Sequence, residues 1–157
     1  IYSHVKVDNE EDVKRNWEEI KLKEGKKSVL EGVPNSLPAM VKANRIQEKV
    51  KGVGFDWEEP GQVLDKVKEE LGELEQELEN PEKGKIEAEF GDVLFSMINY
   101  SRFIKVDPES ALERTNKKFI KRFRYLEEEA KKNGESLKDL TLEQMDVYWN
   151  QSKQHFE

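Results

Sequence analysis

Residues 63–78 read VLDKVKEELGELEQEL, and residues 86–100 read IEAEFGDVLFSMINY. In the first stretch apolar residues recur every three or four positions, which predicts an amphipathic helix. The second stretch is apolar on nearly all sides of a helix, with one narrow polar column, and this is typical of a central helix surrounded by others. Pro81 lies between the two stretches and ends the first helix. Together they predict an antiparallel helical hairpin joined by a short turn.

Two acidic pairs, Glu70 with Glu73 and Glu89 with Asp92, lie at equal distances from the centre of this turn. The midpoint of positions 70 and 92 is 81, and so is the midpoint of positions 73 and 89. In an antiparallel hairpin such residues share one level, so four carboxylates converge about 14 Å from the turn at about 1.5 Å per residue. A single acidic pair usually belongs to a solvated helix surface, but two pairs at one level favour a site.

Four carboxylates in a half-buried position repel one another unless a cation neutralises them. Ligands that are all oxygen suit Mg²⁺ or Mn²⁺ better than Zn²⁺. Di-iron helical bundles use Glu-x-x-His pairs, and the two histidines, His4 and His155, lie too near the chain ends to supply them. The sequence therefore predicts a Mg²⁺ site, with Mn²⁺ as the alternative ion, and argues against redox chemistry.

Composition excludes several other classes of protein. The 157 residues amount to about one domain, and 27 basic against 34 acidic residues give a net charge of −7. Such an acidic chain is poorly suited to coating a nucleic acid polymer. No apolar run is long enough to span a membrane, no secretory signal is recognisable, and no cysteine is present for disulfides or thiolate sites. We expect a cytoplasmic globular protein with neither a membrane nor a nucleic acid partner.

Caps, prolines and glycines mark the remaining elements of an all-α bundle of five to six helices. Further helices are expected at residues 8–27, 38–52 and 108–133, and a last one begins at the capping box Thr141–Gln144. We divide the chain into an N-terminal linker or helix, residues 1–32, and a catalytic domain, residues 33–157. The chain begins with isoleucine rather than methionine, so we expect a processed product or a fragment of a longer protein.

Basic residues crowd into positions 114–124, and most of them are expected to form a solvated face. Lys118 and Arg122 differ, because they flank an apolar stripe and lie four residues apart, within reach of one anion. Two interpretations are open for Trp149 and Lys153. The tryptophan ring stacks on a base while the lysine lies near phosphates, or the tryptophan belongs to the core and the lysine extends past it to solvent. The residues alone favour the second interpretation. Clustered carboxylates with converging cations indicate phosphoryl chemistry, and the lack of a Walker-type loop excludes a P-loop enzyme.

Glu69-Glu70-Leu-Gly-Glu73 followed by Glu89-Phe-Gly-Asp92 resembles the EExxE…ExxD signature of the all-α nucleoside triphosphate pyrophosphohydrolases. The similarity is greatest to the C-terminal catalytic domain of the MazG type, and it extends from about Val33 to Lys153. Other similar segments occur in the same order: Leu37–Met40, Val53–Trp57, Gly91–Phe95, Asn116–Phe123 and Trp149 to Lys153.

This resemblance implies Mg²⁺-dependent hydrolysis of a nucleoside triphosphate to a nucleoside monophosphate and pyrophosphate. It implies metal binding by Glu70, Glu73, Glu89 and Asp92. It also implies nucleotide contacts from five further positions, namely Lys66, Lys118, Arg122, Trp149 and Lys153. The family assembles as dimers of helical bundles, so a homodimer or higher homo-oligomer is expected. Residues 1–32 resemble the segment that follows an upstream domain, so we expect such a domain in the full-length chain.

Several alternatives stay open at this point. Glu69 belongs to the signature and to the expected catalytic set, but it either supports the metal ligands or orients Lys66. Asn99 lies in the polar column and either contacts the nucleotide or makes a hydrogen bond between helices. The leading hypothesis is an enzyme that accepts several nucleoside triphosphates. The alternatives are a narrower relative acting on dUTP, dCTP or phosphoribosyl-ATP, and a non-catalytic dimerisation or regulatory module.

Overall fold

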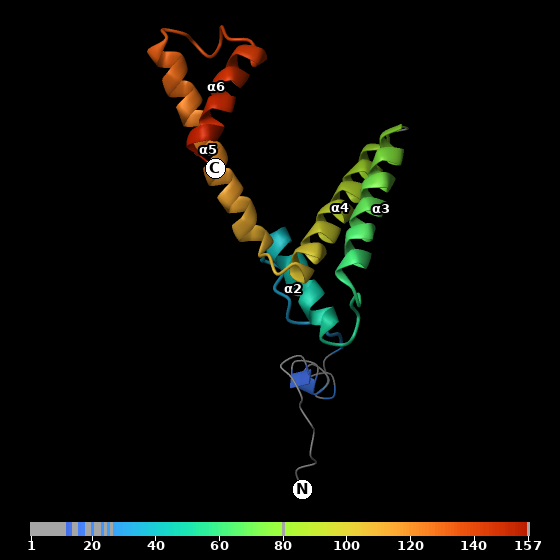
Figure 1. Cartoon of the computed structure of the whole chain (residues 1–157). Helices are drawn as coiled ribbons and strands as arrows, with labels where there is room; N and C mark the ends of the chain where they lie inside the picture. Colours follow the sequence, from blue (N-terminus) through green and yellow to red (C-terminus); the bar gives the residue numbers. More distant parts are fainter. Residues whose placement is uncertain are drawn as a thin grey trace. The chain divides into compact units, whose positions relative to one another are not determined.

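The computed structural model describes residues 27–79 and 81–156, with residues 12, 13, 16, 17, 20, 23 and 25. The expected helix at 8–27 and the segment 1–32 lie largely outside these residues. Five helices have defined bounds, namely α2 (Ala39–Lys51), α3 (Pro60–Glu79), α4 (Lys83–Phe103), α5 (Pro108–Lys132) and α6 (Leu142–His155) (Figure 1). The described part of the chain contains no strand, which confirms the predicted all-α class.

The helices begin and end close to the predicted signals. Thr141 caps α6 in a complete capping box, because its hydroxyl accepts from the Gln144 backbone N–H while the Gln144 side chain accepts from the Thr141 N–H. After α5 the chain turns at Gly134, whose φ of +70° favours glycine. The following residue, Glu135, donates its N–H to the carbonyl of Ala130 at 2.9 Å and so closes the helix end.

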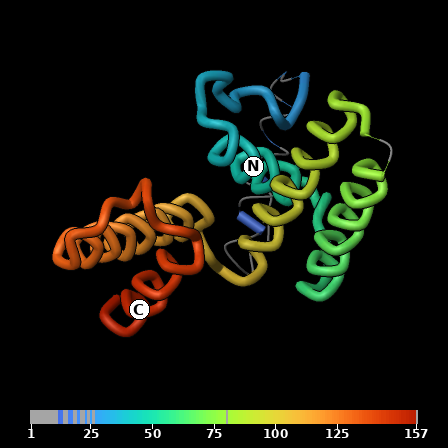
Figure 2. Tube along the Cα trace, turned by 90° about the horizontal axis from the view of Figure 1, so that it is seen from above, coloured from blue at the N-terminus to red at the C-terminus, as the bar shows by residue number. Residues whose placement is uncertain are grey.

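The chain divides into two compact units, Ile1–Pro108 and Glu109–Glu157. In the first unit α3 and α4 form the predicted antiparallel hairpin, and α2 packs against α4 (Figures 1 and 2). Gln47 of α2 joins these helices by donating from Nε2 to the Phe95 carbonyl of α4 at 2.8 Å. The domain division after residue 32 stays a prediction.

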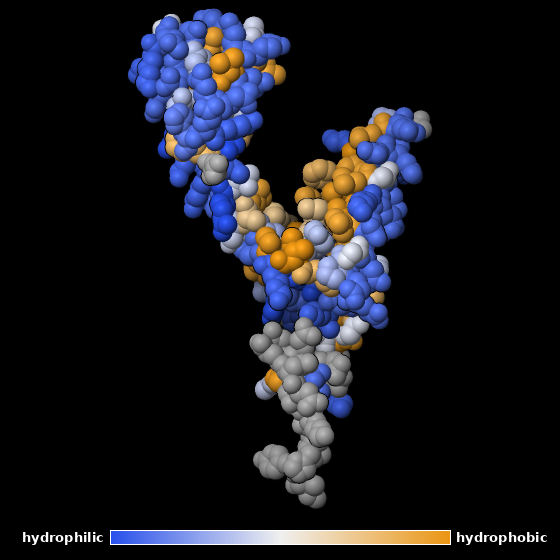
Figure 3. Space-filling model, viewed as in Figure 1, coloured by the Kyte–Doolittle hydropathy of each residue, from blue (hydrophilic) through white to orange (hydrophobic). Residues whose placement is uncertain are grey.

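The buried core of the first unit is small and lies between the hairpin helices and α2. Val63 and Val67 of α3 and Ile98 of α4 are almost fully buried. Other apolar side chains of the hairpin remain open to solvent: Phe90 is 54% exposed and Met97 47% exposed. Figure 3 shows apolar atoms gathered over this hairpin. The expectation that α4 is surrounded on all sides is therefore wrong for the single chain, because α2 and α3 cover only part of it.

In the second unit, α5 and α6 form another hairpin. Leu126 and Ala130 of α5 and Ser152 of α6 are buried in it. The rings of Phe119 and Trp149 pack with their centroids 4.9 Å apart. Across residues 27–79 and 81–156, no helix has both the length and the apolar character needed to cross a membrane.

Candidate metal and nucleotide site

Three carboxylates meet at one level of the α3–α4 hairpin. Glu70 and Glu73 lie three residues apart on one face of α3, and Glu89 faces them from α4. One oxygen from each lies within 4.8 Å of the others. Opposite ligands of a Mg²⁺ ion are about 4.2 Å apart, twice an Mg–O distance of about 2.1 Å. A small side-chain movement would therefore bring all three oxygens onto one ion.

Asp92, the fourth expected ligand, does not belong to this close group of described acids. It follows Glu89 by three residues on α4 and is exposed. Its side chain lines the adjoining pocket together with Lys66 and Glu70. The structure thus brings three of the four predicted metal ligands together and places the fourth at the edge of the same site.

The cluster carries more negative charge than its own cation neutralises. Lys66 pairs with Glu69 at 2.8 Å and with Glu70 at 2.7 Å, and these two carboxylates raise the pKa of Lys66, which therefore stays protonated. The pKa of the Glu73 carboxyl is raised, first by the charge of Glu70, then by burial and by Glu89, while Lys66 opposes the shift. A further positive charge would stabilise this arrangement.

Glu89 provides an independent indication that this cluster suits a cation. Its Oε2 atom is buried and has no hydrogen-bond partner within the described part of the chain. A buried acceptor without a partner is costly, and a carboxylate oxygen is more costly still. The donor set is made only of carboxylate oxygens, which suits a hard divalent cation. These residues therefore fit a divalent metal ion.

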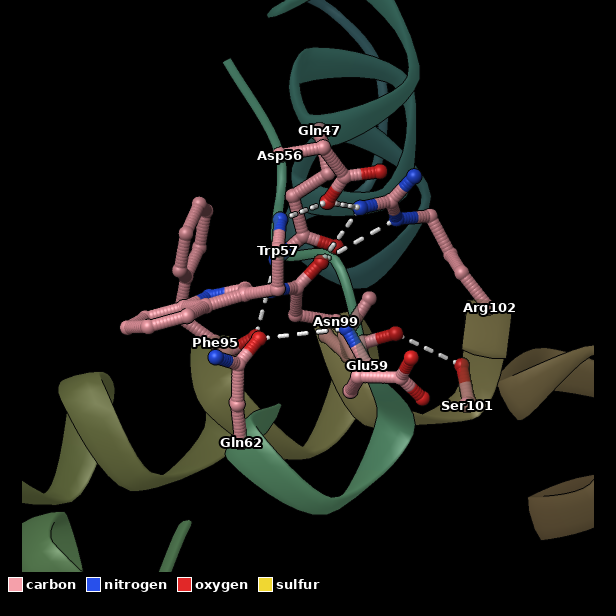
Figure 4. A network of polar contacts seen from close by, with 10 residues as sticks. Gln47, Asp56, Trp57, Glu59, Gln62, Phe95, Asn99, Ser101 and Arg102 are labelled. Carbon is pink, nitrogen blue, oxygen red and sulfur yellow. Dashed lines mark hydrogen bonds and ion pairs between the residues drawn. The ribbon is translucent and has the colours of Figure 1, made fainter. Parts of the chain in front are cut away.

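A pocket of about 500 Å³ opens beside the carboxylates. It is formed by α2, the loop before α3, and the facing sides of α3 and α4. Its charged part holds Lys66, Glu70 and Asp92, and its aromatic part holds Phe55, Trp57 and Phe95. Between them lie three further polar side chains, Gln47, Asn99 and Arg102, shown in Figure 4. The pocket thus joins an anionic corner, whose carboxylates fit a metal ion, to a space lined by aromatic side chains.

A largely buried ion pair holds the loop of this pocket against α4. Arg102 contacts Asp56 at 2.8 Å, and their side chains are only 12% and 16% exposed. Both Nε and Nη2 of Arg102 also donate to Asn99 Oδ1, at 3.1 and 2.6 Å. The Asp56 carboxylate further accepts the Trp57 backbone N–H at 3.0 Å. The hydrogen bond of Asn99 thus lies within α4, three residues along the same helix, and is not the expected bond between helices; its NH₂ group is left to act as a donor.

Sequence reasoning missed Asp56, Arg102 and Gln47. A signal existed for Arg102, because it is the first charge after the uncharged run at residues 93–101 and so requires an anion nearby. No comparable pattern marks Gln47, whose burial depends on how α2 packs against α4.

The other expected nucleotide contacts lie in the second unit. Arg122 donates from Nε and Nη2 to the Phe156 carbonyl at 2.9 and 2.7 Å. Lys153 donates to Asn150 at 2.9 Å, and Lys118 is exposed. Trp149 is half-buried against Phe119. The roles of these four residues toward a nucleotide stay predictions.

Comparisons with known proteins agree with the sequence resemblance. Residues 58–127 match the MazG nucleotide pyrophosphohydrolase domain. The chain is 47% identical over 142 residues to the nucleoside triphosphate pyrophosphohydrolase/pyrophosphatase MazG of Thermotoga maritima, covering 88% of this chain and 54% of that protein. It is 36% identical over 159 residues to the nucleoside triphosphate pyrophosphohydrolase of Escherichia coli K12, covering 98% of this chain and 60% of that protein.

A third relative is the uncharacterized protein YabN of Bacillus subtilis, which is 46% identical over 158 residues. That match covers 98% of this chain and 32% of the relative. The chain therefore spans a little over half the length of the two relatives named as pyrophosphohydrolases, and about a third of YabN.

Proposed function

We propose that this chain, whose residues 58–127 match the MazG nucleotide pyrophosphohydrolase domain, hydrolyses nucleoside triphosphates in the cytoplasm and releases a nucleoside monophosphate and pyrophosphate. One observation supports this above all others. Three carboxylates lie beside a pocket that ends in aromatic side chains, and one of them has a buried oxygen without a partner among the described residues. A triphosphate with its metal suits the first part, and a nucleoside suits the second.

In this proposal Glu70, Glu73, Glu89 and Asp92 hold Mg²⁺, and Mn²⁺ would also suit their oxygens. When bound, the ion polarises the phosphate and activates a water molecule. Lys66 stays charged and lies at the pocket edge, where its ammonium binds a phosphate oxygen. Glu69 positions Lys66 through the 2.8 Å ion pair.

The second unit would supply additional recognition of the triphosphate. Lys118, Arg122 and Lys153 carry charge of the sign that phosphates require, and Trp149 offers a ring face. The resemblance to the MazG type supports this assignment.

We further propose that the chain functions as a homodimer. Phe90, Met97 and Leu71 of the α3–α4 hairpin are roughly half exposed, although apolar side chains of this size favour burial. A second copy of the chain would cover them and complete the core that one chain leaves small. Sedimentation at micromolar concentration should give twice the chain mass, and Phe90→Asp should shift the distribution to monomer.

The reaction is tested with a panel of nucleoside triphosphates, Mg²⁺ and detection of pyrophosphate. We expect turnover with several bases, which is lost in Glu89→Gln and in Asp92→Asn with the helical circular dichroism spectrum retained. Glu87→Gln is the matched control, because Glu87 is exposed on the same helix. Turnover restricted to dUTP, dCTP or phosphoribosyl-ATP would indicate a narrower enzyme. No turnover of any of these with Mg²⁺ or Mn²⁺ would refute the proposal in favour of a non-catalytic module.

A further inference from the structure

Gln47 of α2 has a buried oxygen that nothing in the described chain satisfies. The residue is only 3% exposed. Its Nε2 donates to the Phe95 carbonyl at 2.8 Å, and because a carbonyl only accepts, this bond sets which way the amide faces. The opposite atom, Oε1, is therefore an acceptor without a donor among the described residues. Such an atom lowers stability unless a partner arrives.

The surroundings of Gln47 indicate what kind of partner it would be. Gln47 lines the pocket that also holds Phe55 and Trp57, and these two rings are 79% and 45% exposed. Exposed aromatic rings at a pocket favour stacking on a flat heterocycle. The same pocket reaches Glu70 and Asp92 at the carboxylate site. A ligand that fills it would carry a flat, polar-edged ring at one end and an anion with its metal at the other.

The polar edge of the pocket presents an acceptor and a donor together. Gln47 Oε1 is the acceptor, and Asn99 contributes its NH₂ group because Arg102 occupies its oxygen. The loop that carries the two rings turns at Gly54, where φ is +87°, and Asp56 ties it to α4. The two exposed rings therefore lie on a loop that is anchored to α4.

We propose that this pocket binds the nucleobase of the substrate and that Gln47 Oε1 accepts a hydrogen bond from an N–H group on the base's Watson–Crick edge. The inference rests on the proposed function, which places the triphosphate at the neighbouring carboxylates. Adenine and cytosine offer an amino group there, and guanine, uracil and thymine offer a ring N–H. The oxygen is covered in the ligand-free chain, so binding of the base requires side chains of the pocket to move.

The test compares ATP with purine riboside triphosphate, which lacks the amino group of adenine. For the wild-type chain, kcat/KM should be about tenfold higher with ATP than with purine riboside triphosphate, mainly because KM is lower. A tenfold difference corresponds to one hydrogen bond to a group that is otherwise unpaired. Gln47→Met keeps the side-chain length but removes the acceptor, so it should use both compounds equally. Ribose 5′-triphosphate, which has no base, should be hydrolysed equally by both proteins and shows that the carboxylates are intact.

The matched control is Gln62→Met at the start of α3. The Gln62 side chain accepts the Glu59 backbone N–H at 3.1 Å and does not line the pocket, so the preference for ATP should persist. Should Gln47→Met fail to fold, Phe55→Ala replaces it, because a 79% exposed ring contributes little to folding. That variant should raise KM for ATP several-fold and leave ribose 5′-triphosphate unaffected.

Two results would overturn the inference: an unchanged ATP preference in Gln47→Met, or an unchanged KM for ATP in Phe55→Ala. The same comparisons are made as dissociation constants by calorimetry. These dissociation constants test base binding even if no triphosphate is hydrolysed. A lack of hydrolysis would count against the proposed reaction and not against the base pocket.

Discussion

The α3–α4 and α5–α6 hairpins are both rich in charged residues, but they place those charges in different surroundings. On α3–α4, Glu70 is buried, Glu73 has a raised pKa, and Glu89 is partly buried with one oxygen that no group in the described part of the chain satisfies. On α5, charged residues such as Lys117 and Lys118 are exposed. The partly buried Arg122 is occupied by the Phe156 carbonyl. The difference teaches that charged residues indicate a site where they are buried and their charge is not fully neutralised, and that the number of charges alone indicates little.

The largest effect should come from the most buried member of the cluster. Glu70→Gln keeps the side-chain shape but removes the charge that pairs with Lys66 and that we propose holds the metal. We expect pyrophosphate release to fall by at least about 100-fold, since metal stabilisation supplies several kcal/mol. Mn²⁺ binding measured by calorimetry should weaken in parallel. Glu75→Gln, an exposed acid on the same helix, is the control, and equal losses in both variants would contradict the assignment.

The Asp56–Arg102 pair tests the same rule for stability. Arg102→Leu leaves a largely buried carboxylate without its cation, so we expect the free energy of unfolding to fall by about 3 kcal/mol. Urea denaturation followed by circular dichroism measures the change. The double variant Asp56→Asn/Arg102→Leu removes the stranded charge and should recover part of the loss. A loss below 0.5 kcal/mol in the single variant, of the order typical for a surface pair, would show that burial does not govern this pair.

The sequence allowed the fold to be predicted because its signals are local. The capping box at Thr141 and the prolines that open α3 and α5 fix the helix ends through backbone chemistry that needs no tertiary contact. Symmetry about Pro81 likewise predicted the common level of Glu70, Glu73 and Glu89, since antiparallel packing follows from the short turn. What failed was the environment of α4, because exposure of Phe90 depends on which elements cover it and periodicity does not report that.

The pocket was the part that sequence reasoning could not predict. Gln47, Asp56 and Arg102 come from three separate segments, and each looks like an ordinary surface residue by type. Their burial arises only when α2 and the loop before α3 pack on α4. A glutamine in a helix carries no pattern of its own, whereas carboxylates repeated at helical spacing do.

Exposed cations of the second unit should have a smaller effect than the buried acids. If Lys118 and Lys153 bind phosphate as proposed, replacing either by Ala should raise KM for a nucleoside triphosphate about tenfold, the upper range for one exposed charge-assisted hydrogen bond. kcat should change less than KM. Lys117→Ala is the control, because Lys117 pairs with Glu113 at 3.4 Å and is not among the expected contacts. An equal rise in KM for the control would indicate a general electrostatic effect rather than placed ligands.

The smallest effect is expected for the exposed pair Lys68–Asp65 on α3. Its atoms are 3.0 Å apart, which is good ion-pair geometry, but the two side chains are 66% and 75% exposed. Water screens the pair, so Lys68→Ala should change the free energy of unfolding by no more than about 0.5 kcal/mol and leave turnover unchanged. Lys66→Ala, two positions away, should lower turnover while retaining the fold, because Lys66 joins the buried Glu70 to the pocket. Equal losses of turnover in the two lysine variants would contradict this distinction. Contact with the buried carboxylate would then not separate Lys66 of the site from Lys68 of the surface.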